Sequence, residues 1–347
     1  MRKEWIDLDA AFLSSASVVG AKESEGPLGA LFDLRDPSDR FGMKSWERAE
    51  SEMQRLSFNT VLAKVKRAEG EVDALFAGDL LNQCVGSAYG LLDFDIPYFG
   101  LYGACSTCAE GLLLAAAMVS SQMMGLCGAV TSSHYCAAER QFRTPLEYGA
   151  QRAPVAQWTV TGAGAFLICS PSEFDEGEAY TAIKRGMVGK VMDCGITDAA
   201  NMGAAMAPAA ADTLTRYFQA TETLPRDYDL IVTGDLGYEG GDILCDLMLA
   251  AGYDVRKNYS DCGQRIYHRK KQDVHGGGSG CGCSAVVLAA ELLPKLCCGE
   301  IGRMLFLGTG ALMSPDSIKQ GAGIPGIAHL LELRHVSAKE GERKKWM

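Results

Sequence analysis

The sequence is short of basic residues. It has 33 lysines and arginines against 43 aspartates and glutamates, a formal net charge of −10 at pH 7. This excess of acid repels the phosphates of nucleic acids, so charge argues against a nucleic-acid partner. For the same reason, we do not expect an anionic membrane surface to attract the chain by charge alone.

The sequence also lacks the apolar segment of a signal peptide. Asp7 and Asp9 fall where that segment would lie. The 13 cysteines are odd in number and scattered from Cys84 to Cys298. We therefore expect a reducing, cytosol-like compartment and free thiols.

Metal-site and dinucleotide motifs are missing as well. Cys281 with Cys283, and Cys105 with Cys108, could each suggest a metal site, but neither pair has a second pair at zinc-site spacing. The glycine-rich turn at residues 280–285 matches a degenerate dinucleotide fingerprint, but no apolar strand precedes it. We expect neither a bound metal nor a nucleotide cofactor.

One uncharged stretch, residues 111–133, is long enough to span a bilayer. Polar residues interrupt it midway, at Ser120, Ser121 and Gln122. The interruption favours a buried helix followed by a buried strand over a membrane span.

With 48% apolar residues in 347, the chain is long enough for about two domains. A short apolar run ends at Gly78-Asp79, and a second one, residues 230–233, ends at Gly234-Asp235. In each half, a glycine-containing turn and a long, mostly apolar helical run come later. Unless the repeat is chance, this order predicts two copies of one α/β unit, residues 1–170 and 180–347, in layered sheets and helices. We expect the first forty-odd residues to be turn-rich.

Cys105 is the first candidate for chemistry, because it stands at a predicted strand-to-helix turn. The N–H groups and dipole of a helix N-terminus stabilise a thiolate there. A small buried thiol is the alternative interpretation.

A loop rich in arginines and hydroxyls follows the strand that ends near Thr131, and it contains His134, Arg140 and Arg143. Ligands of α/β sheets bind beyond such strand ends, although each of these residues alone is typical of a solvated surface. Asp193 precedes a run of small residues, where it serves either as a turn residue or as part of a site.

The Gly103-Ala104-Cys105-Ser106 turn and its uncharged helix resemble the thiolase superfamily, in particular the ketoacyl-synthase III-type condensing enzymes. Motifs along nearly the whole chain are similar to the stage V sporulation AD family of spore-forming bacteria, among them residues 77–83, 131–134, 138–143, 206–213 and 308–312. The resemblance implies a thiolase-like α/β fold, with two duplicated halves layered α-β-α-β-α.

The resemblance also implies a role in spores. The family binds dipicolinic acid, pyridine-2,6-dicarboxylate, and belongs to the apparatus that moves it into the developing spore. The implied location is the periphery of the forespore or spore inner membrane, reached through other stage V sporulation A proteins, and the implied assembly is a homodimer. The calcium chelate is an alternative form of the ligand, because it cancels the charge of a dianion.

The sequence departs from the condensing enzymes where their catalytic partners stand. Those enzymes pair the cysteine with histidine and asparagine, or with two histidines. Here Gly234 and Asp235 follow the second-half strand, and Ser279 and Cys281 stand in the glycine-rich turn. We therefore expect a binding protein without catalytic residues or cofactor. The expected ligand contacts are Cys105, Asp193, Ser279, His134, Arg140 and Arg143.

Two alternatives stay open on the sequence. One is an acyl-transfer enzyme that uses Cys105 on a coenzyme A thioester. The other is a scaffold that only docks on membrane partners.

Overall fold

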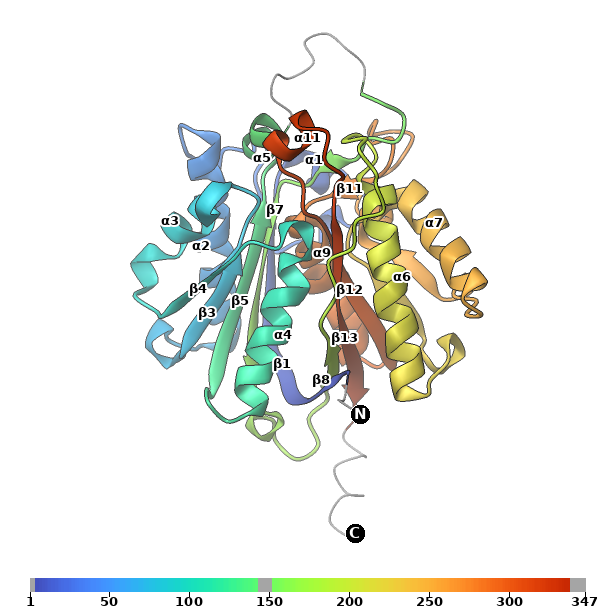
Figure 1. Ribbon diagram of the computed structural model, residues 1–347. Helices are drawn as coiled ribbons and strands as arrows, with labels where there is room; N and C mark the ends of the chain where they lie inside the picture. Colours follow the sequence, from blue (N-terminus) through green and yellow to red (C-terminus); the bar gives the residue numbers. More distant parts are fainter. Residues whose placement is uncertain (1–3, 143–151, 338–347) are drawn as a thin grey trace.

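The main sheet of the computed structural model has 11 strands (Figure 1). The structure describes residues 4–142 and 152–337. The strands run in the order β10-β9-β12-β13-β8-β1-β7-β5-β3-β4, and β2 pairs with β1. Their bounds are β1 Ile6–Val19, β2 Leu34–Arg35, β3 Ala74–Gly78, β4 Tyr98–Leu101, β5 Leu126–Ser133, β7 Gly162–Cys169, β8 Tyr180–Met187, β9 Leu230–Thr233, β10 Tyr259–Asp261, β12 Arg303–Ala311 and β13 Gly326–Val336.

The two halves of the sheet repeat one topology. In the first half, β3 is parallel to β4 and β5, and β7 is antiparallel to β5 and β1. In the second half, β9 is parallel to β10 and β12, and β13 is antiparallel to β12 and β8. This confirms the fold of duplicated α/β halves. Antiparallel pairing of β1 with β8 joins the halves into one sheet, and the proposed division near residues 170–180 stays a prediction.

Helices form three layers around the two halves of the sheet. The middle layer contains α4 (Thr107–Ser120) and α9 (Cys281–Val287), whose side chains share one apolar core with both halves. On the outer faces lie α2 (Trp46–Val65), which packs on the first half, and α6 (Met202–Thr221) with α7 (Gly237–Ala250), which pack on the second. The smaller helices are α1 Ala21–Ser24, α3 Val85–Gly90, α5 Tyr135–Phe142, α8 Cys262–Arg265, α10 Leu293–Cys297 and α11 Pro315–Lys319.

The uncharged stretch at 111–133 forms most of α4 and then β5, so the predicted buried helix and buried strand are confirmed. All eight residues of β5 are buried, as is usual for a strand covered on both faces. Within residues 4–142 and 152–337, no helix combines the length and apolar character needed to cross a bilayer.

Strand β7 lets a helix approach closely. A Cβ atom on Gly164 would lie 2.7 Å from the Cβ of Ala285 in α9. A side chain at this position would push the central helix off the sheet, so glycine is required here for packing.

The prediction for the N-terminal region was wrong in one respect. Residues 6–19 form the long strand β1, between β7 and β8 in the middle of the sheet. Serines 14, 15 and 17 interrupt its apolar pattern. The serines have only a weak preference for a strand, but pairing with strands on both sides outweighs that preference.

Candidate ligand site

A cavity of about 340 Å³ opens where the two halves meet. It lies near the C-terminal ends of β3, β4 and β12, at the end of the molecule that carries α5 and α11 (Figure 1). Both halves contribute its lining: Leu80, Asn82, Tyr102, Ala104, Cys105, Ala138, Glu139, Phe142, Thr159, Met202, Ser279, Ala311, Leu312, Met313, Ser314 and Pro315.

Cys105 reaches this cavity from a tight turn between β4 and α4. Ala104 has the left-handed backbone angle φ 51°, which is uncommon for a residue with a side chain. Two hydroxyls hold the turn: Ser106 Oγ donates to the Gly103 carbonyl at 2.6 Å, and Thr107 Oγ1 donates to the Ala104 carbonyl at 2.7 Å. The sequence therefore builds a pinned, strained turn that fixes the thiol at the cavity wall.

Asp235 lies directly behind Cys105 and is fully buried. Its carboxylate accepts hydrogen bonds from the Gly280 N–H at 2.9 Å, Thr309 Oγ1 at 2.8 Å and Ser279 Oγ at 3.2 Å. The carboxylate also acts on the neighbouring Cys105 thiol, whose pKa it raises. Burial raises the pKa of Asp235, and these donors oppose that rise.

The electrostatics of Cys105 oppose thiolate formation. Burial raises the pKa of the Cys105 thiol well above its ordinary value, and the Asp235 carboxylate raises it further. The Gly280 N–H and the Ser279 hydroxyl only partly offset these effects. Burial and the neighbouring carboxylate therefore favour the alternative interpretation, a small buried thiol, over the thiolate.

Cys105 should therefore alkylate slowly. At pH 8, we expect iodoacetamide to modify it about a hundredfold or more slowly than the exposed Cys194. Peptide mass spectrometry after short pulses of reagent would measure both rates. Comparable rates would mean that the thiolate forms readily and would restore Cys105 as a nucleophile.

Two of the predicted site residues, Cys105 and Ser279, line the cavity together. Ser279 belongs to β11 (Gly278–Ser279), which pairs with β6 (Trp158–Thr159), and Thr159 also lines the cavity. The short sheet formed by β6 and β11 thus makes one wall of the site.

His134 and Arg140 are not among the lining residues. The His134 ring is buried, its Nε2 lies 2.8 Å from the Asp39 carbonyl, and burial lowers its pKa. Since a carbonyl can only accept, Nε2 carries the proton. Arg140 is exposed and forms an ion pair with Glu47.

Asp193 is exposed in the loop that follows β8, where it accepts a hydrogen bond from the Gly195 N–H at 2.8 Å. It is not a lining residue either. Arg143 lies outside the described residues. Ligand contacts by these four predicted residues, His134, Arg140, Asp193 and Arg143, stay predictions.

The sequence analysis missed several polar lining residues, among them Glu139 and Thr159. These two meet at the cavity wall, where Thr159 Oγ1 donates to Glu139 Oε1 at 2.8 Å. Glu139 lies in the family motif 138–143, but its arginines drew the prediction instead, and Thr159 stands in no quoted motif. Asp235 did carry a signal, since it directly follows the end of a buried strand.

Metal ligands do not gather at this site. Over the described part of the chain, no group of three or more histidine, cysteine, aspartate or glutamate side chains is arranged to hold a metal ion. All 13 cysteines are free thiols in the structure.

Comparison with known proteins identifies a family over almost the entire chain. The model of the family described as stage V sporulation protein AD matches residues 2–334. The stage V sporulation protein AD of Bacillus subtilis (strain 168) is 42% identical over 330 residues, which cover 94% of this chain and 95% of that protein.

Solved structures show the same fold at much lower identity. A variant of OleA from Xanthomonas campestris superposes with a TM-score of 0.61 at 14% identity, covering 96% of this chain and 99% of that one. The 3-oxoacyl-[acyl-carrier-protein] synthase III of Aquifex aeolicus VF5 superposes with a TM-score of 0.57 at 10% identity, covering 94% and 99%. This confirms the thiolase-like fold expected from the sequence.

Proposed function

Because the chain belongs to the stage V sporulation protein AD family, we propose that it binds dipicolinic acid in the cavity beside Cys105 and does not turn it over. The observation that carries this proposal is the buried Asp235 carboxylate beside the Cys105 thiol, whose pKa burial and this carboxylate raise. This arrangement leaves the cavity with a polar wall but without an activated nucleophile.

Acyl transfer is the alternative, and the geometry disfavours it. A condensing reaction needs a thiolate nucleophile and neutral or cationic donors for the oxygen that becomes negative. Asp235 sits against Cys105 as an acceptor, and its negative charge would oppose both the thiolate and the oxyanion. The acyl-transfer step would therefore lack both a thiolate nucleophile and stabilisation of the oxyanion.

The charge of the cavity favours a ligand whose own charge is neutralised. Its lining contains the acid Glu139, Asp235 lies just behind it, and the described residues contribute no lysine or arginine to the lining. A free dicarboxylate would meet like charge at close range. Its calcium chelate is neutral, so we propose the chelate as the preferred form, with Cys105, Ser279 and Asn82 as candidate polar contacts.

The direct test is calorimetric titration of the chain with dipicolinate, with and without calcium. Cys105→Ala should weaken binding about tenfold while changing the melting temperature little, because one polar contact leaves the cavity wall. The matched control is Cys108→Ala, one helical turn further along α4, which removes a buried thiol outside the cavity. This control should keep its affinity.

Two other results would overturn the proposal. One is the same affinity for dipicolinate in Cys105→Ala and the parent, which would move the site elsewhere. The other is release of coenzyme A from acetyl or malonyl thioesters that disappears in Cys105→Ala, which would establish the enzyme.

We also propose that the chain forms a homodimer through β4 and works with other stage V sporulation A proteins at the spore inner membrane. β4 is an edge strand, and it exposes the large rings of Tyr98 and Phe99. An exposed apolar edge is suited to pairing with another chain. The neighbouring Tyr102 lines the cavity, so such pairing would take place close to the ligand.

A further inference from the structure

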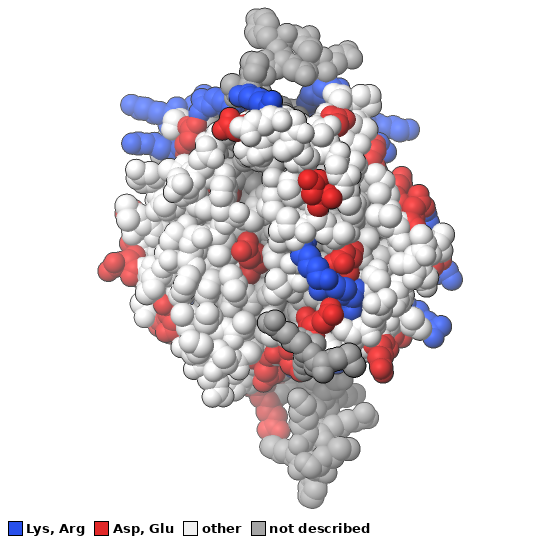
Figure 2. All heavy atoms as spheres, viewed as in Figure 1, with Lys and Arg blue, Asp and Glu red and all other residues white. Residues whose placement is uncertain are grey.

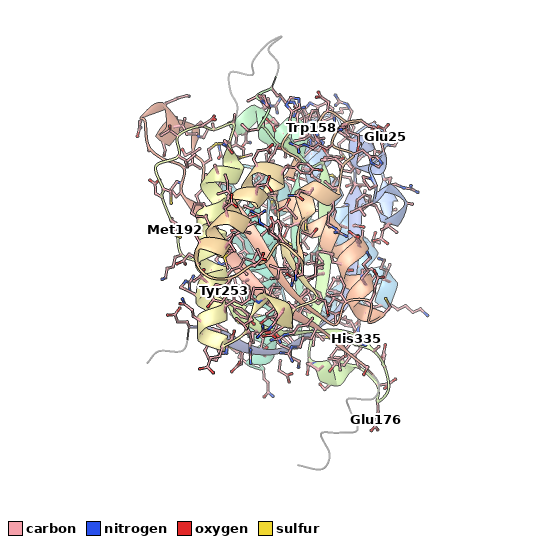
Figure 3. The ribbon with its side chains drawn as sticks, turned by 90° about the vertical axis from the view of Figure 1, so that its right-hand side faces the viewer. Glu25, Trp158, Glu176, Met192, Tyr253 and His335 are labelled. Carbon is pink, nitrogen blue, oxygen red and sulfur yellow. The ribbon has the colours of Figure 1, made fainter. Side chains whose placement is uncertain are left out.

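Trp158 in β6, the residue before the lining residue Thr159, has an unusual set of contacts. The ring of Tyr135 stacks on it at a centroid distance of 4.0 Å and an interplanar angle of 11°. The Lys22 ammonium lies 3.7 Å from the ring centroid, and the Arg152 guanidinium carbon lies 4.8 Å from it. Figure 3 places Trp158 and Glu25 at the same end of the molecule, opposite Glu176.

Both cations have donors without a partner. Nη1 of Arg152 is buried and makes no hydrogen bond. Within residues 4–142 and 152–337, the Lys22 ammonium has no hydrogen-bond or ion-pair partner, and its close contact is the Trp158 ring. Unsatisfied buried donors are rare in folded proteins, and an unseen ion or water is a common explanation.

Three acids lie around these two cations, but none of them forms an ion pair with the Lys22 ammonium within the described residues. Nη2 of Arg152 contacts Asp273, whose other carboxylate oxygen lies 2.9 Å from His275 Nε2. Glu23 and Glu25 act on Lys22 only through space, and burial and Arg152 together lower the pKa of Lys22. Two like charges over one ring are unfavourable unless an anion lies between them.

We propose that Lys22 and Arg152 form a binding site for an oxyanion, the carboxylate or phosphate group of a ligand, beside the ring of Trp158. Arg152 Nη1 and the Lys22 ammonium supply charge-assisted donors. This site is separate from the cavity: Thr159 lines the cavity, Trp158 does not, and neighbours in a strand point to opposite faces. Figure 2 shows basic side chains gathered along this end of the molecule, which favours capture of anions.

The test uses inorganic phosphate as the probe, titrated into the full chain by calorimetry at constant ionic strength. Lys22→Gln and Arg152→Gln should each weaken phosphate binding roughly tenfold. The matched control is Arg269→Gln. Arg269 also lies over an aromatic ring, that of Tyr238 at 3.9 Å, but its guanidinium is already paired with Glu239 at 2.9 Å. This control should bind phosphate like the parent.

Vesicles distinguish the source of the oxyanion. Phosphatidylglycerol vesicles that bind the parent but neither variant would support the site with a lipid headgroup as its ligand. Binding of free phosphate alone would support it with a small soluble ligand. Absence of binding to both probes, or equal losses in Arg269→Gln, would overturn the proposal. Circular dichroism of each variant would verify that it is folded.

Discussion

Asp235→Asn should strengthen the binding of calcium-free dipicolinate about tenfold or more, which corresponds to roughly 1.4 kcal/mol. The substitution removes a buried negative charge that lies behind Cys105 and Ser279. Two like charges a few ångströms apart in a partly buried site repel by at least that much. The asparagine oxygen can still accept from the Gly280 N–H, so the turn is retained. Calorimetric titration at pH 8 would measure the change.

The calcium chelate should gain much less from the same substitution, because a neutral complex does not feel the lost charge. Asp198→Asn is the matched control: it removes one exposed acid that does not line the cavity. Equal gains for the free and the chelated ligand in Asp235→Asn would show that the charge of Asp235 does not select between them.

The stability of Asp261→Asn relative to the parent should rise with pH. Asp261 is fully buried, Thr233 Oγ1 donates to it at 2.6 Å, and burial raises its pKa from 3.8 to about 7. The raised pKa means that the folded protein holds this proton more tightly than the unfolded chain does. The contribution of Asp261 to stability is therefore complete below pH 4 and is lost as the pH rises through about 7.

Asparagine imitates the protonated acid at every pH. We therefore expect the difference in unfolding free energy, Asp261→Asn minus parent, to increase by roughly 2–3 kcal/mol between about pH 5 and pH 8. Urea unfolding at both pH values would measure it. The buried His329, whose pKa burial lowers to about 4, acts in the opposite direction but cancels in the difference. Asp198→Asn, an exposed acid, should show a constant difference, and a constant difference for Asp261→Asn would refute the prediction.

The elements that could be predicted from the sequence were those with an uninterrupted apolar pattern. β3 and β9 are short, fully apolar runs that end in Gly-Asp, and α4 is uncharged except for Glu110. The local amino-acid composition determines the secondary structure of such segments. β1 was missed because its serines imitate a loop, and only pairing with strands more than 140 residues away along the chain makes it a strand.

The residues of the candidate site also differ in how far the sequence could predict them. Cys105 and Ser279 were predictable because each stands at a turn before a central helix. Asp193 was expected beside them, but the structure places it in an exposed loop. Asp235 lies beside Cys105 only because of how the two halves are oriented, and residue spacing along the sequence does not reveal that orientation.

The position of β1 has a consequence for how the chain folds during synthesis. Apart from the two-residue strand β2, the hydrogen-bonding neighbours of β1 are β7 and β8, which are translated much later: β7 begins at Gly162 and β8 ends at Met187. At roughly 5–20 residues per second, a ribosome needs on the order of ten seconds to add the missing partners. During that time most of the strand is outside the exit tunnel without its partner strands, exposed to premature pairing with other segments. The rate of translation across the first half should therefore affect the yield of folded protein more than the rate across the second.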